Sequence, residues 1–131
     1  HCISAAASDV YKTQAPDTAL ALTSHLPHAV AAALAATVPP RLLPLSAGAY
    51  RDGTRVAASD AALWAGIFLA NRQPVLDALA TFEGRLAAFR RALEAGDDEV
   101  LRAWWSAAAR ARKSLDDPTT IPHPEPAGPS A

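Results

Sequence analysis

Six large apolar residues in the second half of the chain recur at alternating steps of four and three residues. They are Val75, Leu79, Phe82, Leu86, Phe89 and Leu93. This alternation places all six on one seam of a helix, a pattern typical of two helices packed lengthwise. We therefore expect a long helix, terminated by Gly96, that packs along another helix. Because several such stripes share one short chain, we expect a second copy to cover one of them in an intertwined homodimer.

The composition favours helices throughout. The chain has 131 residues, half of them hydrophobic, with alanine abundant and only 6 glycines. β-Branched residues are few and scattered, which argues against strands. We predict one all-α domain, large enough to bury a core without disulfide bonds.

Charge, hydropathy and cysteine content exclude several classes of protein. The formal net charge is -1, without the basic stripe of a nucleic-acid-binding protein. The longest apolar run, Ala29 to Val38, is too short to span a bilayer, so we expect no membrane contact. Cys2 is the only cysteine, which fits a cytoplasmic protein. Because the chain starts at His1 and has no methionine, we expect a fragment, a processed chain or one end of a longer protein.

The first apolar stripe contains a proline. From Asp17 to about Val38, apolar residues return at three- and four-residue steps, at Leu22, Leu26, Ala29, Val30, Ala33, Leu34 and Val38. An interior proline costs a helix about 3 kcal/mol. Either the helix kinks at Pro27, or a new helix begins with Ser24 as N-cap and Pro27 in its first turn.

The middle of the chain is predicted as a loop followed by a short helix. Residues 39–53 hold three prolines and two glycines, which indicates a loop. Ser59 is the expected N-cap of the next helix, with Asp60 in its first turn. The expected buried face of that helix comprises Leu63, Trp64, Ile67 and Phe68. Residues 71–74 then mark a break before the long helix.

A final helix is framed by charges that oppose its dipole. It begins at Asp97, Asp98 and Glu99 and ends at Arg110, Arg112 and Lys113. Its apolar face comprises Leu101, Trp104, Trp105, Ala108 and Leu115. Adjacent tryptophans cannot share one face, so we expect one in the core and one exposed or at an interface. We thus divide the chain into an irregular segment 1–16, a helical domain 17–115 and a Pro-rich disordered tail or linker 116–131.

Two histidines flank Pro27 inside this apolar stripe. His25 and His28 lie three residues apart and share a face of a regular helix. They could begin a metal site, although no nearby residue completes the three protein ligands that zinc needs. They could be one buried and one exposed histidine. Alternatively, one lines a ligand pocket, where imidazole can donate to a carboxylate or carbonyl.

A second polar island surrounds Arg55. Its guanidinium is suited to a bidentate contact with a carboxylate, and Asp52 could hold it in place or act as its resting counter-ion. The alternative is a surface Asp52–Arg55 pair that contributes little. Trp64 is either a core residue or the wall of a ligand site. We find no nucleophile elbow, phosphate loop or dinucleotide fingerprint, so no catalytic residue or cofactor site is predicted in this segment.

Taken together, three sequence motifs resemble those of a known enzyme family. They are similar to motifs of the C-terminal helical domain of prephenate dehydrogenases. The first is Ser24-His25-Leu26-Pro27-His28, the second is Tyr50-Arg51-Asp52-Gly53-Thr54-Arg55-Val56-Ala57, and the third is Ser59-Asp60 with Trp64, Ile67, Phe68 and Asn71. That family also includes arogenate and cyclohexadienyl dehydrogenases. The resemblance runs from about residue 17 to 113, in the same order and with similar gaps.

The resemblance implies a two-domain, cytoplasmic enzyme of tyrosine biosynthesis. An N-terminal Rossmann domain of the same protein would bind NAD or NADP, and this helical domain would form a homodimer and close the substrate pocket. The implied reaction is oxidative decarboxylation of prephenate to 4-hydroxyphenylpyruvate, with this segment alone inactive. The substrate-binding residues that the resemblance implies are Arg55, paired with a carboxylate, His28, Asp52, Trp64, Ser24 and His25.

Two other functions remain open. The chain could belong to an arogenate dehydrogenase of the same family. It could also be a non-catalytic helical dimerisation module, which would have no affinity for anions and would tolerate Arg55→Ala.

Overall fold

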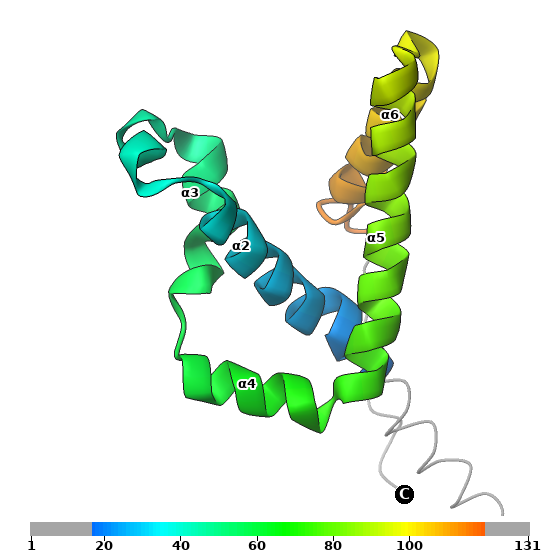
Figure 1. Ribbon diagram of the computed structural model, residues 1–131. Helices are drawn as coiled ribbons and strands as arrows, with labels where there is room; N and C mark the ends of the chain where they lie inside the picture. The colour runs from blue at the N-terminus through cyan, green and yellow to red at the C-terminus, as the bar shows by residue number, and fades with distance from the viewer. Residues whose placement is uncertain (1–16, 120–131) are drawn as a thin grey trace, which may run out of the picture. The chain divides into compact units, whose positions relative to one another are not determined.

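The computed structural model describes residues 17–119, and every regular element in that range is a helix (Figure 1). The prediction of an all-α fold is confirmed. The chain forms two compact units that divide between Glu83 and Gly84. The predicted irregular segment 1–16 and most of the Pro-rich tail 116–131 lie outside the described residues.

The first unit contains a series of short helices after one longer one. The longer helix, Asp17–Thr37, includes a π-helical turn η1 (Ala21–His25) and α2 (Leu26–Thr37). The 3-10 helix η2 (Pro40–Leu45), α3 (Gly48–Thr54), the 3-10 helix η3 (Arg55–Ala58) and α4 (Ala61–Ala70) follow. The long α5 (Arg72–Ala95) begins in this unit and ends in the second, which also contains α6 (Asp98–Ser114).

A π-helical turn precedes Pro27. The N–H of Leu26 donates to the carbonyl of Ala21, five residues earlier, so the helix widens by one residue immediately before the proline. Proline lacks an N–H and its ring crowds the preceding turn, which a wider turn accommodates. The alternative of a new helix capped by Ser24 is wrong, because the residue before α2 is His25 in helical geometry without a side-chain cap. The predicted kink stays a prediction.

By length and composition alone, the 21-residue helix Asp17–Thr37 could cross a membrane. The sequence-based argument against a membrane span used only the apolar run from Ala29 to Val38. The observed helix is longer, because it continues through the polar residues that precede this run. A single such helix is weak evidence for a membrane span, since the core helix of a soluble protein passes the same test.

The predicted loop at residues 39–53 is wrong in both halves, because η2 forms at residues 40–45 and α3 begins at residue 48. Two features hold α3 against α2 (Figure 1). The Tyr50 hydroxyl donates to the carbonyl of Ala35 at 3.4 Å, and a Cβ on Gly53 would lie 3.4 Å from Leu34 Cδ2. Gly53, taken as a loop residue in the sequence, instead lies inside α3 and faces Leu34 of α2.

The N-cap of α4 lies one residue later than predicted. Asp60, not Ser59, accepts a hydrogen bond from the N–H of Leu63, at 2.8 Å, whereas the Ser59 hydroxyl donates to Val56. The predicted buried face is wrong for Leu63, which is 59% exposed, and its other members are half-buried. The predicted break is confirmed, because Asn71 separates α4 from α5.

In the second unit, the turn between α5 and α6 follows the prediction. Gly96 has a φ of 63°, its N–H donates to Leu93, and the N–H of Asp97 donates to Ala92. This pair of bonds is a Schellman motif, which favours glycine at the left-handed position. Asp97 then caps α6 by accepting from the N–H of Val100 at 3.1 Å. The predicted end of α5 at Gly96 and the predicted start of α6 at Asp97 and Asp98 are confirmed.

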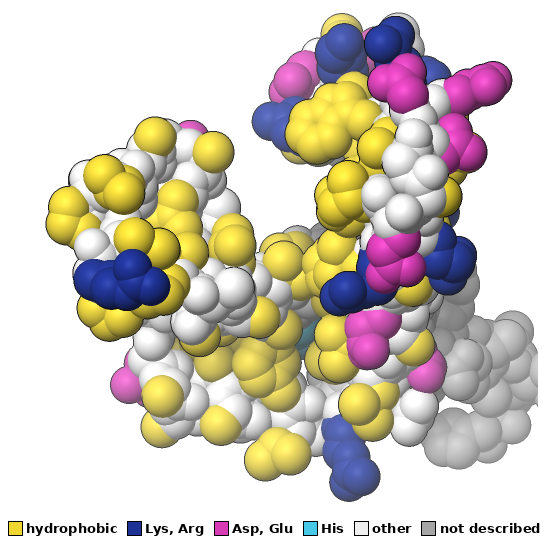
Figure 2. Space-filling model, turned by 45° about the horizontal axis from the view of Figure 1, so that its top comes forward, with side chains coloured by type: hydrophobic (Ala, Val, Ile, Leu, Met, Phe, Trp, Pro, Cys, Tyr) yellow, Lys and Arg dark blue, Asp and Glu magenta, His cyan; other side chains and the backbone are white. Residues whose placement is uncertain are grey.

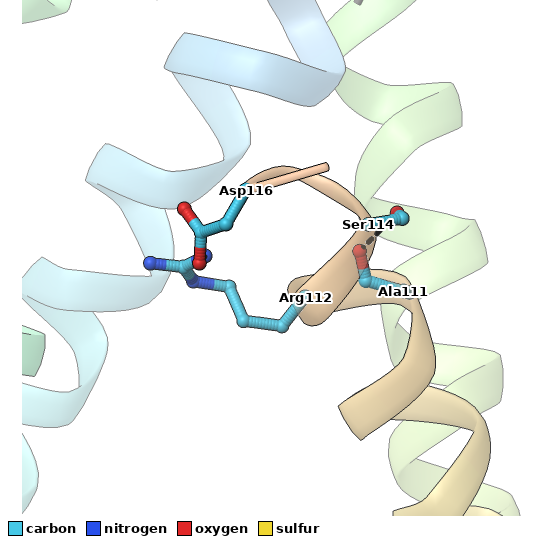
Figure 3. A network of polar contacts seen from close by, with 4 residues as sticks. All are labelled: Ala111, Arg112, Ser114 and Asp116. Atoms are coloured by element: carbon cyan, nitrogen blue, oxygen red, sulfur yellow. Dashed lines mark hydrogen bonds and ion pairs between the residues drawn. The ribbon is translucent and has the colours of Figure 1, made fainter. Parts of the chain in front are cut away.

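The last turn of α6 carries exposed polar contacts. Arg112 and Asp116 form an ion pair at 3.2 Å, and the Ser114 hydroxyl donates to the carbonyl of Ala111 (Figure 3). Both charged side chains are mostly exposed, so this pair contributes little to stability. Beyond it, the backbone N–H and the hydroxyl of Thr119 donate to Asp117 and lower the pKa of that exposed carboxyl.

The two adjacent tryptophans of α6 have different environments, as predicted. The indole N–H of Trp104 donates to the carbonyl of Arg85 at 3.1 Å, and its ring lies 5.0 Å from that of Phe89. Trp105 is 69% exposed. Trp104 therefore joins α6 to α5, while Trp105 faces outward.

Replacing Trp104 with alanine is expected to lower the free energy of unfolding of the chain by about 2 kcal/mol, because it removes a hydrogen bond and half-buried aromatic area. The matched variant Trp105→Ala should change it by less than about 0.5 kcal/mol. Urea unfolding followed by circular dichroism measures both. Equal losses would show that Trp105 also has a buried contact.

The described residues of this single chain bury few large side chains. Only four residues, Ala21, Ala31, Ala78 and Ala92, are buried, and no large side chain is fully enclosed. Hydrophobic side chains cover much of the visible surface (Figure 2). Two members of the heptad seam, Leu86 and Leu93, are 46% and 57% exposed. The expected core is therefore wrong for residues 17–119 of one chain, which present apolar surface typical of an interaction site.

Candidate functional site

An open groove of about 330 Å³ lies in the first unit. We call it the His28–Trp64 groove. Its lining includes His28 and Ala32 from α2, Val56 and Ala57 from η3, and Trp64 and Phe68 from α4. Two of the residues that the sequence singled out, His28 and Trp64, thus meet at one site although they come from different helices.

Stacked aromatic rings form one wall of the groove. The rings of His28 and Trp64 are nearly parallel, 18° apart, with centroids separated by 3.6 Å. The Phe68 ring lies 5.6 Å from that of Trp64. Such a wall offers flat apolar area for an aromatic or ring-shaped ligand. Trp64 was predicted to be either a core residue or the wall of a ligand site. The half-buried ring does both, because it packs against neighbouring side chains and also lines the groove.

The hydrogen bond of His28 sets its tautomer. His28 Nδ1 lies 2.7 Å from the carbonyl oxygen of Ser24, one turn earlier. A carbonyl can only accept, so Nδ1 carries a proton. Nε2 is the remaining polar atom of the ring. It accepts a hydrogen bond when the ring is neutral and donates one when the ring is protonated.

His25 lies on another side of Trp64, in the opposite tautomer. Its ring meets Trp64 edge-on, with centroids 6.1 Å apart and a 79° angle. The amide nitrogen of Asn71 lies 3.1 Å from His25 Nδ1 and 2.9 Å from the carbonyl oxygen of Asp17. Because the amide donates to both, His25 Nδ1 is an acceptor and its proton resides on Nε2. Asn71 was predicted as a helix break and as part of the motif shared with prephenate dehydrogenases, but no role was predicted for its side chain. Its contacts with Asp17 and His25 make it a site residue.

The remaining predicted site residues lie outside the lining of the groove. Ser24 contributes its carbonyl to His28, and no side-chain hydrogen bond is formed by it within the described range. Asp52 on α3 and Arg55 at the start of η3 are exposed. The predicted Asp52–Arg55 pair is not formed, since residues 17–119 contain only the ion pairs Asp98–Arg102 and Arg112–Asp116. Arg55 directly precedes Val56, which lines the groove, but it does not itself line the groove.

A metal site at His25 and His28 would need a third protein ligand, and none lies near them in the part of the chain that the structure describes. No three His, Cys, Asp or Glu side chains gather there. The Nδ1 atoms of His25 and His28 are also both occupied by hydrogen bonds. The arrangement is suited instead to holding an organic ligand against an aromatic wall.

Comparison with known proteins identifies the family. Residues 12–107 match the family model of the prephenate dehydrogenase dimerization domain, which is most of the chain. The chain therefore belongs to this family of dehydrogenase dimerization domains.

Individual relatives agree with this assignment. A cyclohexadienyl dehydrogenase of Zymomonas mobilis is 38% identical over 106 residues, which cover 76% of this chain and 36% of the relative. A prephenate dehydrogenase of Bacillus subtilis is 31% identical and matches over 76% of this chain and 28% of its own length. The chain thus spans about a third of the curated relatives that it matches.

A solved structure shares the fold. The prephenate dehydrogenase of A. aeolicus, crystallised with hydroxyphenyl propionate and NAD+, superposes with a TM-score of 0.69 and 33% identity. The match covers 76% of this chain and 37% of that structure.

Proposed function

We propose that this chain is the substrate-binding and dimerisation segment of a cytoplasmic prephenate dehydrogenase. The reaction is NAD(P)-dependent oxidative decarboxylation of prephenate to 4-hydroxyphenylpyruvate in tyrosine biosynthesis. The observation that carries the proposal is the His28–Trp64 groove, where an aromatic wall meets an imidazole with a free Nε2. The hydroxyphenyl propionate of the A. aeolicus complex has the ring and carboxylate that such a groove would hold.

Each predicted site residue has a role in this proposal. His28 contacts the substrate through Nε2, and Trp64 supplies the wall against its ring. Arg55, which is exposed and directly precedes the groove residue Val56, pairs with a carboxylate of the substrate. Asp52 lies near the pocket mouth, and Ser24 and His25 support the wall. Helical residues 17–115 form the substrate-binding and dimerisation domain.

The nicotinamide cofactor is assigned to another domain of the same protein. The described residues contain no strand followed by a glycine-rich turn and a helix, the geometry that binds a dinucleotide pyrophosphate. We therefore assign none of the described residues to NAD or NADP. A Rossmann domain of the same protein would bind this cofactor, which accepts the hydride.

The exposed apolar surface supports a homodimer. Large hydrophobic side chains are exposed in both units, among them Leu45, Leu69 and Leu115 at 61–79%. Burying such area gains roughly 25 cal/mol per Å², which a second copy can supply. The description of the family as a dimerization domain points the same way.

A ligand titration tests the groove. In the chain titrated with 3-(4-hydroxyphenyl)propionate, we expect the indole NMR signal of Trp64 to shift saturably. Trp104 and Trp105, which lie in the other unit, serve as internal controls because they are the only other tryptophans. Movement of Trp64 alone supports the proposal. If a well-formed dimer shows no shift of Trp64, the chain is a non-catalytic dimerisation module.

A further inference from the structure

We propose that Asn71 is a positioning residue, which fixes the tautomer of His25 and thereby holds the Trp64–His28 wall of the groove. The inference rests on the proposed function only for the identity of the ligand. It arises from a network of contacts that begins and ends on the first helix. In order, the network comprises the Asp17 carbonyl, Asn71, His25, Trp64, His28 and the Ser24 carbonyl.

The orientation of the Asn71 amide follows from its partners. Its nitrogen lies 2.9 Å from the carbonyl oxygen of Asp17. The opposite amide orientation would place two oxygens against each other, so the group at that position must be the NH₂. One of its hydrogens goes to Asp17, and the other goes to His25 Nδ1 at 3.1 Å. Both donors of Asn71 are thus used on the first helix.

The amide contact determines how His25 is held. An acceptor at Nδ1 excludes the tautomer with a proton there, so the imidazole is held with its proton on Nε2. The ring then lies edge-on to Trp64, whose ring is also stacked on His28. Without Asn71, His25 can rotate or change tautomer, and the edge contact that holds Trp64 weakens.

The His28 end of the network is fixed independently. Its Nδ1–H donates to the Ser24 carbonyl, which belongs to the same helix as Asp17. The two histidines are therefore held in opposite tautomers, on two sides of one indole. This arrangement keeps the wall in one geometry before a ligand arrives, which reduces the ordering cost of binding. Asn71 contributes to it from the junction of α4 and α5, without itself lining the groove.

The test is the tautomer of His25, read from the ¹⁵N NMR signals of the ring nitrogens in the whole chain. In the wild type we expect His25 protonated at Nε2 and His28 at Nδ1. In Asn71→Asp, the carboxylate cannot donate, so we expect a proton on His25 Nδ1 while His28 is unchanged. Gln73→Glu is the matched control, because it makes the same charge change two residues away, on an exposed side chain whose hydrogen bond within residues 17–119 is to Asp77.

The inference is overturned if wild-type His25 carries its neutral-ring proton on Nδ1. It is also overturned if Asn71→Asp leaves the His25 tautomer unchanged. A second measurement follows the ligand. In Asn71→Ala, we expect the affinity for 3-(4-hydroxyphenyl)propionate to fall about fivefold, the effect of one lost hydrogen bond. Unchanged affinity in Asn71→Ala would remove the positioning role.

The tautomer measurement also separates the two proposals. If the wild type does not bind 3-(4-hydroxyphenyl)propionate, the proposed function fails, whereas the tautomers of His25 and His28 can still be read. If the ligand binds but the tautomer is not set by Asn71, the proposed function stands and the positioning role fails.

Discussion

Replacing Arg55 with alanine is expected to raise the KM for prephenate by about 10- to 100-fold, with a much smaller change in kcat. The variant is made in the chain joined to its cofactor-binding domain and assayed with NAD. A charge-assisted hydrogen bond contributes about 1.5–3 kcal/mol, which corresponds to this range of affinity. Arg55 is exposed and forms no ion pair within residues 17–119, so its guanidinium is available to a carboxylate.

A neighbouring arginine provides the matched control for this experiment. Arg51 is an exposed residue of α3, four residues before Arg55, and Arg51→Ala makes the same change of charge. We expect its KM to stay within about twofold of the wild type. Arg55→Lys should recover only part of the affinity, because lysine cannot make a bidentate contact. Equal KM values for wild type and Arg55→Ala would make Arg55 an ordinary surface residue.

Replacing Trp64 with alanine is expected to have two large effects. It removes a half-buried indole that contacts His25, His28 and Phe68, so the free energy of unfolding should fall by about 2–3 kcal/mol. It also removes the aromatic wall of the groove, so the affinity for 3-(4-hydroxyphenyl)propionate should fall at least tenfold. Urea unfolding and calorimetric titration measure the two effects on the same samples.

Two variants separate these effects. Trp64→Phe keeps an aromatic ring beside His28 and should retain most of both properties. Leu63→Ala changes the preceding residue of α4, which is 59% exposed, and should change stability by less than about 0.5 kcal/mol. Loss of stability in Trp64→Ala with unchanged affinity would place the ligand elsewhere.

The local signals in the sequence were reliable at the turn between α5 and α6. Gly96 and Asp97 predict the turn from their residue types alone, because a left-handed position favours glycine and a helix N-terminus favours an aspartate cap. The resemblance to prephenate dehydrogenases likewise rested on short motifs that can be recognised in the sequence without knowing the fold. Signals spread over a few adjacent residues do not depend on the rest of the fold.

Predictions failed where a contact between distant residues decides the outcome. Gly53 suggested a loop, yet it lies inside α3, which packs beside Leu34 of α2. Asn71 was predicted as a helix break and as part of the family motif, but its contacts could not be predicted, because its partners Asp17 and His25 lie 54 and 46 residues away. The chain was expected to bury a core, but exposed apolar side chains lie over both units.

The sequence by itself determined that this chain forms helices, where the α5–α6 turn lies, and which family it belongs to. These properties depend on periodicity, capping residues and short motifs, all of which act over one or two helical turns. Only the tertiary structure decided that His28 stacks on Trp64 and that Asn71 bridges Asp17 to His25. Such contacts require helices to pack in one particular arrangement, and neither helical periodicity nor composition specifies that arrangement.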